Sequence, residues 1–132
     1  MTLAFYNDKL QSIRPDKSSG RAKPHKVCMM FAVMDLIEQG YIQNNRIYYD
    51  ETLKKRFSWH FLRLKQGNDA DSPFLPFYHL KSSGLWYLDV SNENKPAFDA
   101  IKSATDANMS KLVNFAYLDE ALFDYLKSPS TA

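Results

Sequence analysis

Two short clusters of residues hold the side chains with which this chain could recognise a ligand. The first cluster, Lys23-Pro24-His25-Lys26, stands where a basic stretch meets an apolar one. Proline is favoured in the first turn of a helix, and the backbone N–H groups at a helix N-terminus attract anions. The side chains of His25 and Lys26 could contact the same anion. The cluster therefore predicts a phosphate contact, with an ordinary helix start and exposed lysines as the alternative.

The second cluster, Leu75-Pro76-Phe77-Tyr78-His79, is largely apolar. A proline ring beside aliphatic and aromatic groups gives a rigid surface with few polar atoms for water to hydrate. Phe77 is more typical of a core residue, whereas Leu75, Pro76 and His79 are candidates for such a surface. The alternative is an ordinary core strand.

Other residue patterns argue against an enzyme. The chain has three histidines and one cysteine, and it contains no C-x-x-C, H-E-x-x-H, P-loop or G-x-G-x-x-G pattern. Zinc sites and nucleotide sites need such ligand sets and glycine-rich turns. Cys28 lies in an apolar segment, where a buried structural thiol is the expected state. We therefore expect no catalytic site, no metal and no cofactor in these 132 residues, with a metal-dependent nuclease as the alternative.

The charge of the chain is polarised, although the formal net charge is only +2. Residues 1–66 hold twelve Lys/Arg and six Asp/Glu, whereas residues 67–132 hold five and nine. The densest basic stretch runs from Lys9 to Lys26 and contains a single acidic residue, Asp16. Lysines and arginines near phosphates release counterions and give sequence-independent affinity. The pattern favours a polyanionic partner, with a solvated basic loop as the alternative.

The elements that must position these residues follow from apolar spacing and from helix signals. We expect helices near residues 5–13, 27–37 and 96–101, another at 118–126, and one that starts after Asp50 or Thr52. Segment 27–37 is apolar nearly all round and should be the central helix, ending at Gly40. The helix after Asp50 should turn one face inward, made of Leu53, Phe57, Phe61 and Leu64.

Strands are expected in two places. Residues 47–49 predict a short strand, and segments 73–80 and 85–90 predict a hairpin around Ser82-Ser83-Gly84. Together the elements predict a single α+β domain over residues 1–132, rich in helix, with a small antiparallel sheet and winged-helix-like. The longest apolar run, Val27 to Met34, is too short to cross a bilayer, and no secretory signal stands at the N-terminus. A lone cysteine fits a reducing compartment, so we expect a cytoplasmic protein.

The order of five motifs is distinctive. They are Lys23-Pro24-His25-Lys26, Asp35-Leu36-Ile37-Glu38-x-Gly40, Pro76-Phe77-x-His79-Leu80, Gly84-Leu85-Trp86-x-Leu88 and Leu118-Asp119-Glu120-x-Leu122. In this order and spacing they resemble the sulfur-binding domain of phosphorothioate-dependent restriction endonucleases, over roughly residues 23–126. In that family the domain is usually joined to a C-terminal HNH nuclease, so the resemblance implies that this chain is part of a longer protein.

The resemblance implies a partner and a set of contact residues. The family grips double-stranded DNA from the major-groove side and holds a phosphorothioate group in a shallow apolar cavity. The matching cavity positions are Leu75, Pro76 and His79, with His25 and Lys26 as polar partners. Leu75 stands where the family often has an aromatic residue, and Val27 where it often has proline. A loop after the hairpin reads bases in the family, and its counterpart here is Lys102-Ser103.

The basic stretch would then contact the DNA backbone through Arg14, Lys17, Arg21 and Lys23. Two other hypotheses remain open. A general winged-helix-like DNA-binding regulator would read DNA with Lys54-Lys55-Arg56, and a protein-interaction domain would need no nucleic acid.

Overall fold

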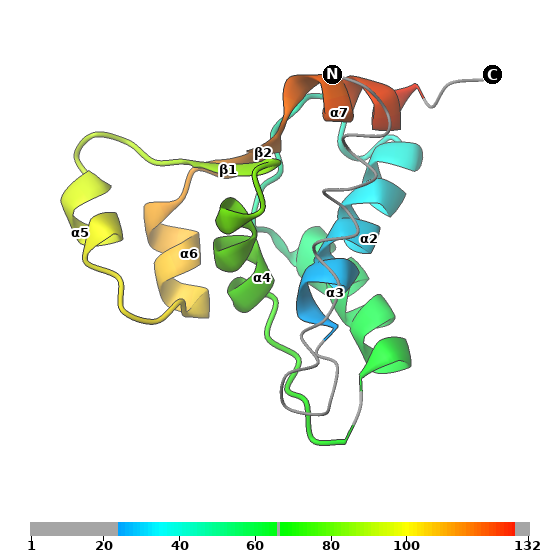
Figure 1. Cartoon of the computed structure of the whole chain (residues 1–132), viewed down its shortest axis with the longest axis horizontal. Helices are drawn as coiled ribbons and strands as arrows, with labels where there is room; N and C mark the ends of the chain where they lie inside the picture. Colours follow the sequence, from blue (N-terminus) through cyan, green and yellow to red (C-terminus); the bar gives the residue numbers. More distant parts are fainter. Residues whose placement is uncertain (1–23, 66, 129–132) are drawn as a thin grey trace.

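The computed structural model describes residues 24–65 and 67–128. The helix expected at residues 5–13 lies outside the described residues, as does the basic loop that follows it. Within the described ranges the chain is a helix-rich α+β domain with a two-stranded antiparallel sheet (Figure 1). The elements are α2 (His25–Glu38), α3 (Glu51–Leu64), α4 (Phe74–His79), the 3₁₀ turn η1 (Leu80–Ser82), β1 (Trp86–Asp89), α5 (Lys95–Asp99), α6 (Asp106–Leu112), β2 (Phe115–Leu118) and α7 (Glu120–Lys127).

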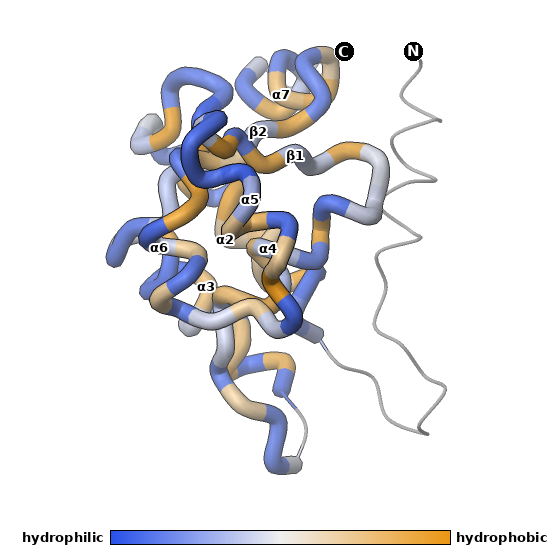
Figure 2. Tube along the Cα trace, turned by 90° about the vertical axis from the view of Figure 1, so that its left-hand side faces the viewer, coloured by the Kyte–Doolittle hydropathy of each residue, from blue (hydrophilic) through white to orange (hydrophobic). Residues whose placement is uncertain are grey.

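Helix α2 is the central element, as its apolar sequence predicts. It packs against α3, α4 and α7, and seven of its fourteen residues are buried. In Figure 2 the tube of α2 carries apolar colours along most of its length, whereas the loop between α3 and α4 is mostly hydrophilic. The helix ends at the expected place, because Gly40 adopts a φ of 82° that side chains disfavour. The amides of Tyr41 and Ile42 then donate to the carbonyl of Leu36 and turn the chain away.

Helix α3 begins at a side-chain cap. Asp50, rather than Thr52, is the cap residue, because its carboxylate accepts the backbone N–H of Leu53 at 2.9 Å. Phe57 and Phe61 are fully buried, as is Leu53. Leu64 was expected on the same buried face, but it is exposed because it is the last residue of the helix.

The predicted hairpin is wrong. Residues 74–79 form helix α4, and β1 pairs with β2, from Trp86 opposite Leu118 to Asp89 opposite Phe115. The prolines that suggested an edge strand lie at the cap and the third position of α4, where backbone N–H groups have no acceptor within the helix. The helix is attached to β1 by the Trp86 indole, whose Nε1–H donates to the carbonyl of Phe77 at 2.9 Å.

The C-terminal half departs from the sequence prediction in two more places. Helix α6 was not anticipated, although Thr105 and Asn108 form a capping box at its start. Strand β2 (Phe115–Leu118) extends into the first residue of the helix expected at 118–126, so α7 starts at Glu120 instead of 118. The strand expected at 47–49 is reduced to one bridge, between Ile47 and Ala116.

The core is continuous among the described residues, because buried side chains from α2, α3, α4, both strands and α7 form one cluster. The arrangement is compatible with a winged-helix-like architecture. No helix in the described ranges combines the length and the apolar character that crossing a bilayer requires.

Candidate functional site

The two clusters found in the sequence meet in one cavity. Its volume is about 350 Å³, and it lies between the first turn of α2, helix α4 and turn η1. We call it the α2–α4 cavity, and its lining residues are His25, Lys26, Leu75, Pro76, His79 and Ser82. Five of these six are the residues that the sequence selected, from segments about fifty positions apart.

The cavity has an apolar wall made by α4. Leu75 is half-buried. Pro76, which the sequence suggested for an accessible surface, is buried because it packs into α4, although it still contributes to the lining of the cavity. The proline lies within the first turn of α4, so its missing N–H leaves no backbone acceptor unpaired. This wall offers carbon atoms rather than hydrogen-bond donors to anything that enters.

The opposite wall is polar and begins with His25. Its Nε2 lies 2.9 Å from the carbonyl oxygen of Ala70, and its ring packs 4.8 Å from the ring of Phe61. Because a carbonyl only accepts, Nε2 carries the proton, and in the neutral ring Nδ1 carries a lone pair.

Lys26 supplies the positive charge of the cavity. Its side chain is half-buried, and among the described residues no carboxylate lies within ion-pair distance of it. This positive charge also acts on the imidazole of His79 across the cavity. Burial lowers the pKa of His79 below its ordinary value, and the charges of Lys26 and Lys81 lower it further. An anion between these groups would offset the same repulsion.

Sequence reasoning missed two residues of this neighbourhood. Ser82 lines the cavity and donates its hydroxyl to the carbonyl of His79 at 3.0 Å. Lys81 holds its ammonium 4.7 Å from the ring centre of Tyr78. The signal was present, because the two residues lie two and three positions after His79, but the segment around them was interpreted as part of a hairpin.

The other predicted contact residues are not part of this cavity. Lys102 and Ser103 are exposed in the connection between α5 and α6, where the Ser103 carbonyl accepts the side-chain amide of Asn108 at 3.1 Å. They do not line the α2–α4 cavity. The predicted backbone contacts Arg14, Lys17, Arg21 and Lys23 lie outside the described residues.

The alternative hypothesis assigned DNA binding to Lys54-Lys55-Arg56 on α3, but two of these three side chains form ion pairs within the protein. Lys54 lies 3.1 Å from Asp106, and Arg56 lies 2.6 Å from Asp35. Although burial alone would raise it, hydrogen bonds from His60 and Arg56 hold the pKa of Asp35 below its usual value. Of the three basic residues of this segment, Lys55 alone is classed as exposed.

Metal ligands and the single thiol are the remaining groups with possible chemistry. In residues 24–65 and 67–128 there is no group of three or more His, Cys, Asp or Glu side chains that could hold a metal ion. Cys28 is fully buried in α2. Burial, with the charge of Asp71, raises the pKa of its thiol to about 11, so the reactive thiolate is disfavoured near neutral pH.

No protein-family model and no curated protein matches the chain.

Proposed function

We propose that this chain is a DNA-recognition module that binds phosphorothioate-modified double-stranded DNA and has no catalytic site of its own. The observation that carries the proposal is the meeting of Leu75 and Pro76 with His25, Lys26 and His79 around one cavity of about 350 Å³. The ordered motifs that resemble sulfur-binding domains support the same conclusion independently of the geometry.

The apolar wall accounts for discrimination. Replacing a non-bridging phosphate oxygen with sulfur keeps the negative charge but makes the atom larger, softer and less strongly hydrated. Carbon atoms of Leu75 and Pro76 gain dispersion contact with sulfur. An oxygen in the same position would lose its hydration without gaining a hydrogen bond, which is unfavourable.

The cationic side accounts for affinity. Lys26, and His79 when it is protonated, attract the phosphate whether or not it carries sulfur, and His25 is a further polar partner. About 1.4 kcal/mol of difference between the two DNAs is a tenfold selectivity, so a modest gain at the apolar wall is sufficient.

The resemblance extends the proposal to the protein's setting. A module of this kind would bring a nuclease domain, located outside these residues, to modified DNA in the cytoplasm. Recognition and cleavage would then be separable activities.

A titration of two matched duplexes tests the proposal. The duplexes share one sequence and differ only in a single phosphorothioate, and binding is followed by fluorescence anisotropy. We expect the sulfur-containing duplex to bind several-fold more tightly. Equal affinities would end the idea of a sulfur reader.

The same assay separates the proposal from a general DNA-binding regulator. A regulator that reads DNA through α3 would lose binding on charge reversal at Lys55 and would be indifferent to Pro76→Ala. The sulfur reader predicts the opposite ranking of these two variants.

A further inference from the structure

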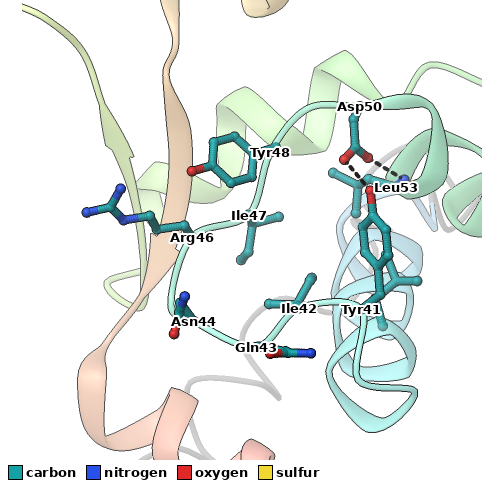
Figure 3. Close-up of a pocket in the computed structure, with 10 residues that line it drawn as sticks. Tyr41, Ile42, Gln43, Asn44, Arg46, Ile47, Tyr48, Asp50 and Leu53 are labelled. Atoms are coloured by element: carbon teal, nitrogen blue, oxygen red, sulfur yellow. Dashed lines mark hydrogen bonds between the residues drawn. The ribbon is translucent and has the colours of Figure 1, made fainter.

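A second cavity lies near the other end of α2 and has different chemistry (Figure 3). Its volume is about 400 Å³, and the segment from Tyr41 to Asp50 curves around it. We call it the Tyr41–Tyr48 cavity. We propose that it is a docking site for an acidic peptide segment of a protein partner, which inserts a large apolar side chain and places a carboxylate beside Arg46.

The floor of the Tyr41–Tyr48 cavity is apolar. Leu36 and Leu53 come from α2 and α3, and Ile42 and Ile47 come from the loop between these helices. All four residues are almost fully buried in the core, so only small parts of their hydrocarbon side chains face the cavity, and the polar residues of the loop complete its lining. The volume is at the lower end of the range of ligand pockets, which suits one large side chain rather than an extended cofactor.

The rim is built from the residue types that dominate binding energy in protein interfaces. Tyr41 and Tyr48 are 53% and 50% exposed, and Arg46 lines the same cavity on the side of Tyr48, across from Tyr41 (Figure 3). The Arg46 guanidinium stands 4.9 Å from the ring centre of Phe115, which packs edge-on against Tyr48. Tyrosine and arginine are enriched at interface hot spots, where rigid aromatic surface surrounds a pocket.

The charge balance at the rim favours an anionic partner. Asp50 is the one acidic residue among those that line the cavity, and it keeps its negative charge although it accepts the Tyr41 hydroxyl at 2.8 Å and the backbone N–H of Leu53 at 2.9 Å. Two cations, Arg46 and Lys127, stand against this one carboxylate. Arg46 and Lys127 have no carboxylate within ion-pair distance in the described part of the chain. The ammonium of Lys127 is held at the same loop, where it donates to the carbonyl of Gln43 at 2.6 Å.

The loop is held in place before any partner binds. The side chain of Asn45 accepts the N–H of Leu118 at 2.9 Å and donates to its carbonyl at 2.7 Å. Ile47 exchanges two backbone hydrogen bonds with Ala116, at 2.7 and 2.8 Å. A preformed rim lowers the entropy lost on association, so a short peptide can bind measurably.

The position of the cavity separates it from the DNA-binding residues. His25 and Lys26 open α2, whereas Leu36 lies in its last turn, and a helix of fourteen residues is about 21 Å long. DNA and a partner could therefore occupy the two cavities together. The inference does not depend on the sulfur selectivity proposed above.

Three blocked peptides test the inference. The probe is acetyl-Glu-Trp-Asp-amide, the uncharged control is acetyl-Gln-Trp-Asn-amide, and acetyl-Glu-Ala-Asp-amide lacks the large side chain. Each is titrated into the full chain while backbone amide signals are followed by NMR. We expect the probe to shift signals of residues 41–50, the uncharged peptide to bind about two- to fivefold more weakly, and the alanine peptide to give no shift in this segment.

Matched variants show which side chains cause the preference for the charged peptide. Arg46→Gln should remove the preference for the charged peptide, and Lys127→Gln should reduce it. Lys111→Gln, an exposed charge on α6, and Lys26→Ala should leave it unchanged. The inference is overturned by equal binding of the charged and uncharged peptides, by an unchanged preference in Arg46→Gln, or by shifts in residues 41–50 that arise with single-stranded DNA and not with the probe.

Discussion

The two ends of α2 differ in what their cavities can attract and in how they do it. The α2–α4 cavity combines a proline and a leucine with one lysine and two histidines. The Tyr41–Tyr48 cavity combines a buried aliphatic floor with exposed tyrosines and an arginine. The first suits a small anion with one poorly hydrated atom, and the second suits a large side chain next to a carboxylate.

The helix itself explains part of the difference. Unpaired backbone N–H groups make the N-terminus of a helix partly positive, and unpaired carbonyls make the C-terminus partly negative. An anion near His25 is therefore assisted by α2, with Lys26 added to it. Near the C-terminal end an acidic ligand is opposed by the helix, so Arg46 and Lys127 from other segments must supply the attraction. A helix favours an anion at its N-terminal end, whereas an anion at its C-terminal end needs cations from other segments of the chain.

The largest expected effect comes from removing the lysine of the α2–α4 cavity. Lys26→Ala should weaken binding of both the sulfur and the oxygen duplex by about 1.5–3 kcal/mol, because a charge-assisted contact is lost. The slope of log affinity against log salt concentration should fall by about one. Arg46→Gln, which removes a cation from the other cavity, is the control and should change neither quantity. An unchanged salt slope in Lys26→Ala would remove this residue from the phosphate site.

Trimming the proline should alter selectivity rather than affinity. Pro76→Ala removes two ring carbons from the apolar wall, and at about 0.8 kcal/mol for each buried methylene up to about 1.5 kcal/mol of sulfur preference is lost. Affinity for the oxygen duplex should be nearly unchanged. Pro96→Ala makes the same chemical change at an exposed site in α5 and should affect neither DNA. Parallel loss of both affinities in Pro76→Ala would indicate a structural role only.

A smaller effect is expected at the rim of the Tyr41–Tyr48 cavity. Tyr41→Phe removes the hydroxyl that bonds Asp50, and it should lower the free energy of unfolding by about 1 kcal/mol. Urea denaturation measures the change, and DNA affinity should stay the same. Tyr48→Phe is the matched control, since the hydroxyl of its exposed ring makes no hydrogen bond to another described residue. Equal stabilities of the two variants would show that the Tyr41–Asp50 bond contributes nothing.

The sequence was informative where local chemistry decides the structure. The apolar run of α2, its end at Gly40 and the Asp50 cap are local features, and each was correct or among the stated options. The cavity residues were found because unusual types cluster in short segments. That the two segments meet was implied only by resemblance, since contact between α2 and α4 depends on packing across fifty residues.

The errors have one physical origin. Proline is compatible both with an edge strand and with the first turn of a helix, so residues 73–80 were ambiguous. Because this segment was assigned to a hairpin, β1 was paired with residues 73–80 in the prediction, and the strand β2 was not predicted at all. The true pairing joins Trp86 to Leu118 across thirty-two positions, and no local pattern records it.

The smallest expected effect is a pH dependence that only the α2–α4 cavity should show. The pKa of His79 lies below its ordinary value of 6.5 in the free protein because of burial and the charges of Lys26 and Lys81. A bound phosphate adds a negative charge beside the imidazole, so the pKa of His79 must be higher in the complex than in the free chain. Binding then takes up protons, and affinity should rise as pH falls from the pKa of the complex to that of the free protein. The informative quantity is the affinity of the natural chain divided by that of His79→Gln, because this ratio isolates the contribution of the His79 side chain. This ratio should increase about threefold between pH 7.5 and pH 5.5, where the imidazole becomes charged.

Peptide binding at the Tyr41–Tyr48 cavity is the control and should show no difference between the natural chain and His79→Gln over the same pH range. A DNA-affinity ratio that does not vary with pH would mean that His79 does not face the bound phosphate.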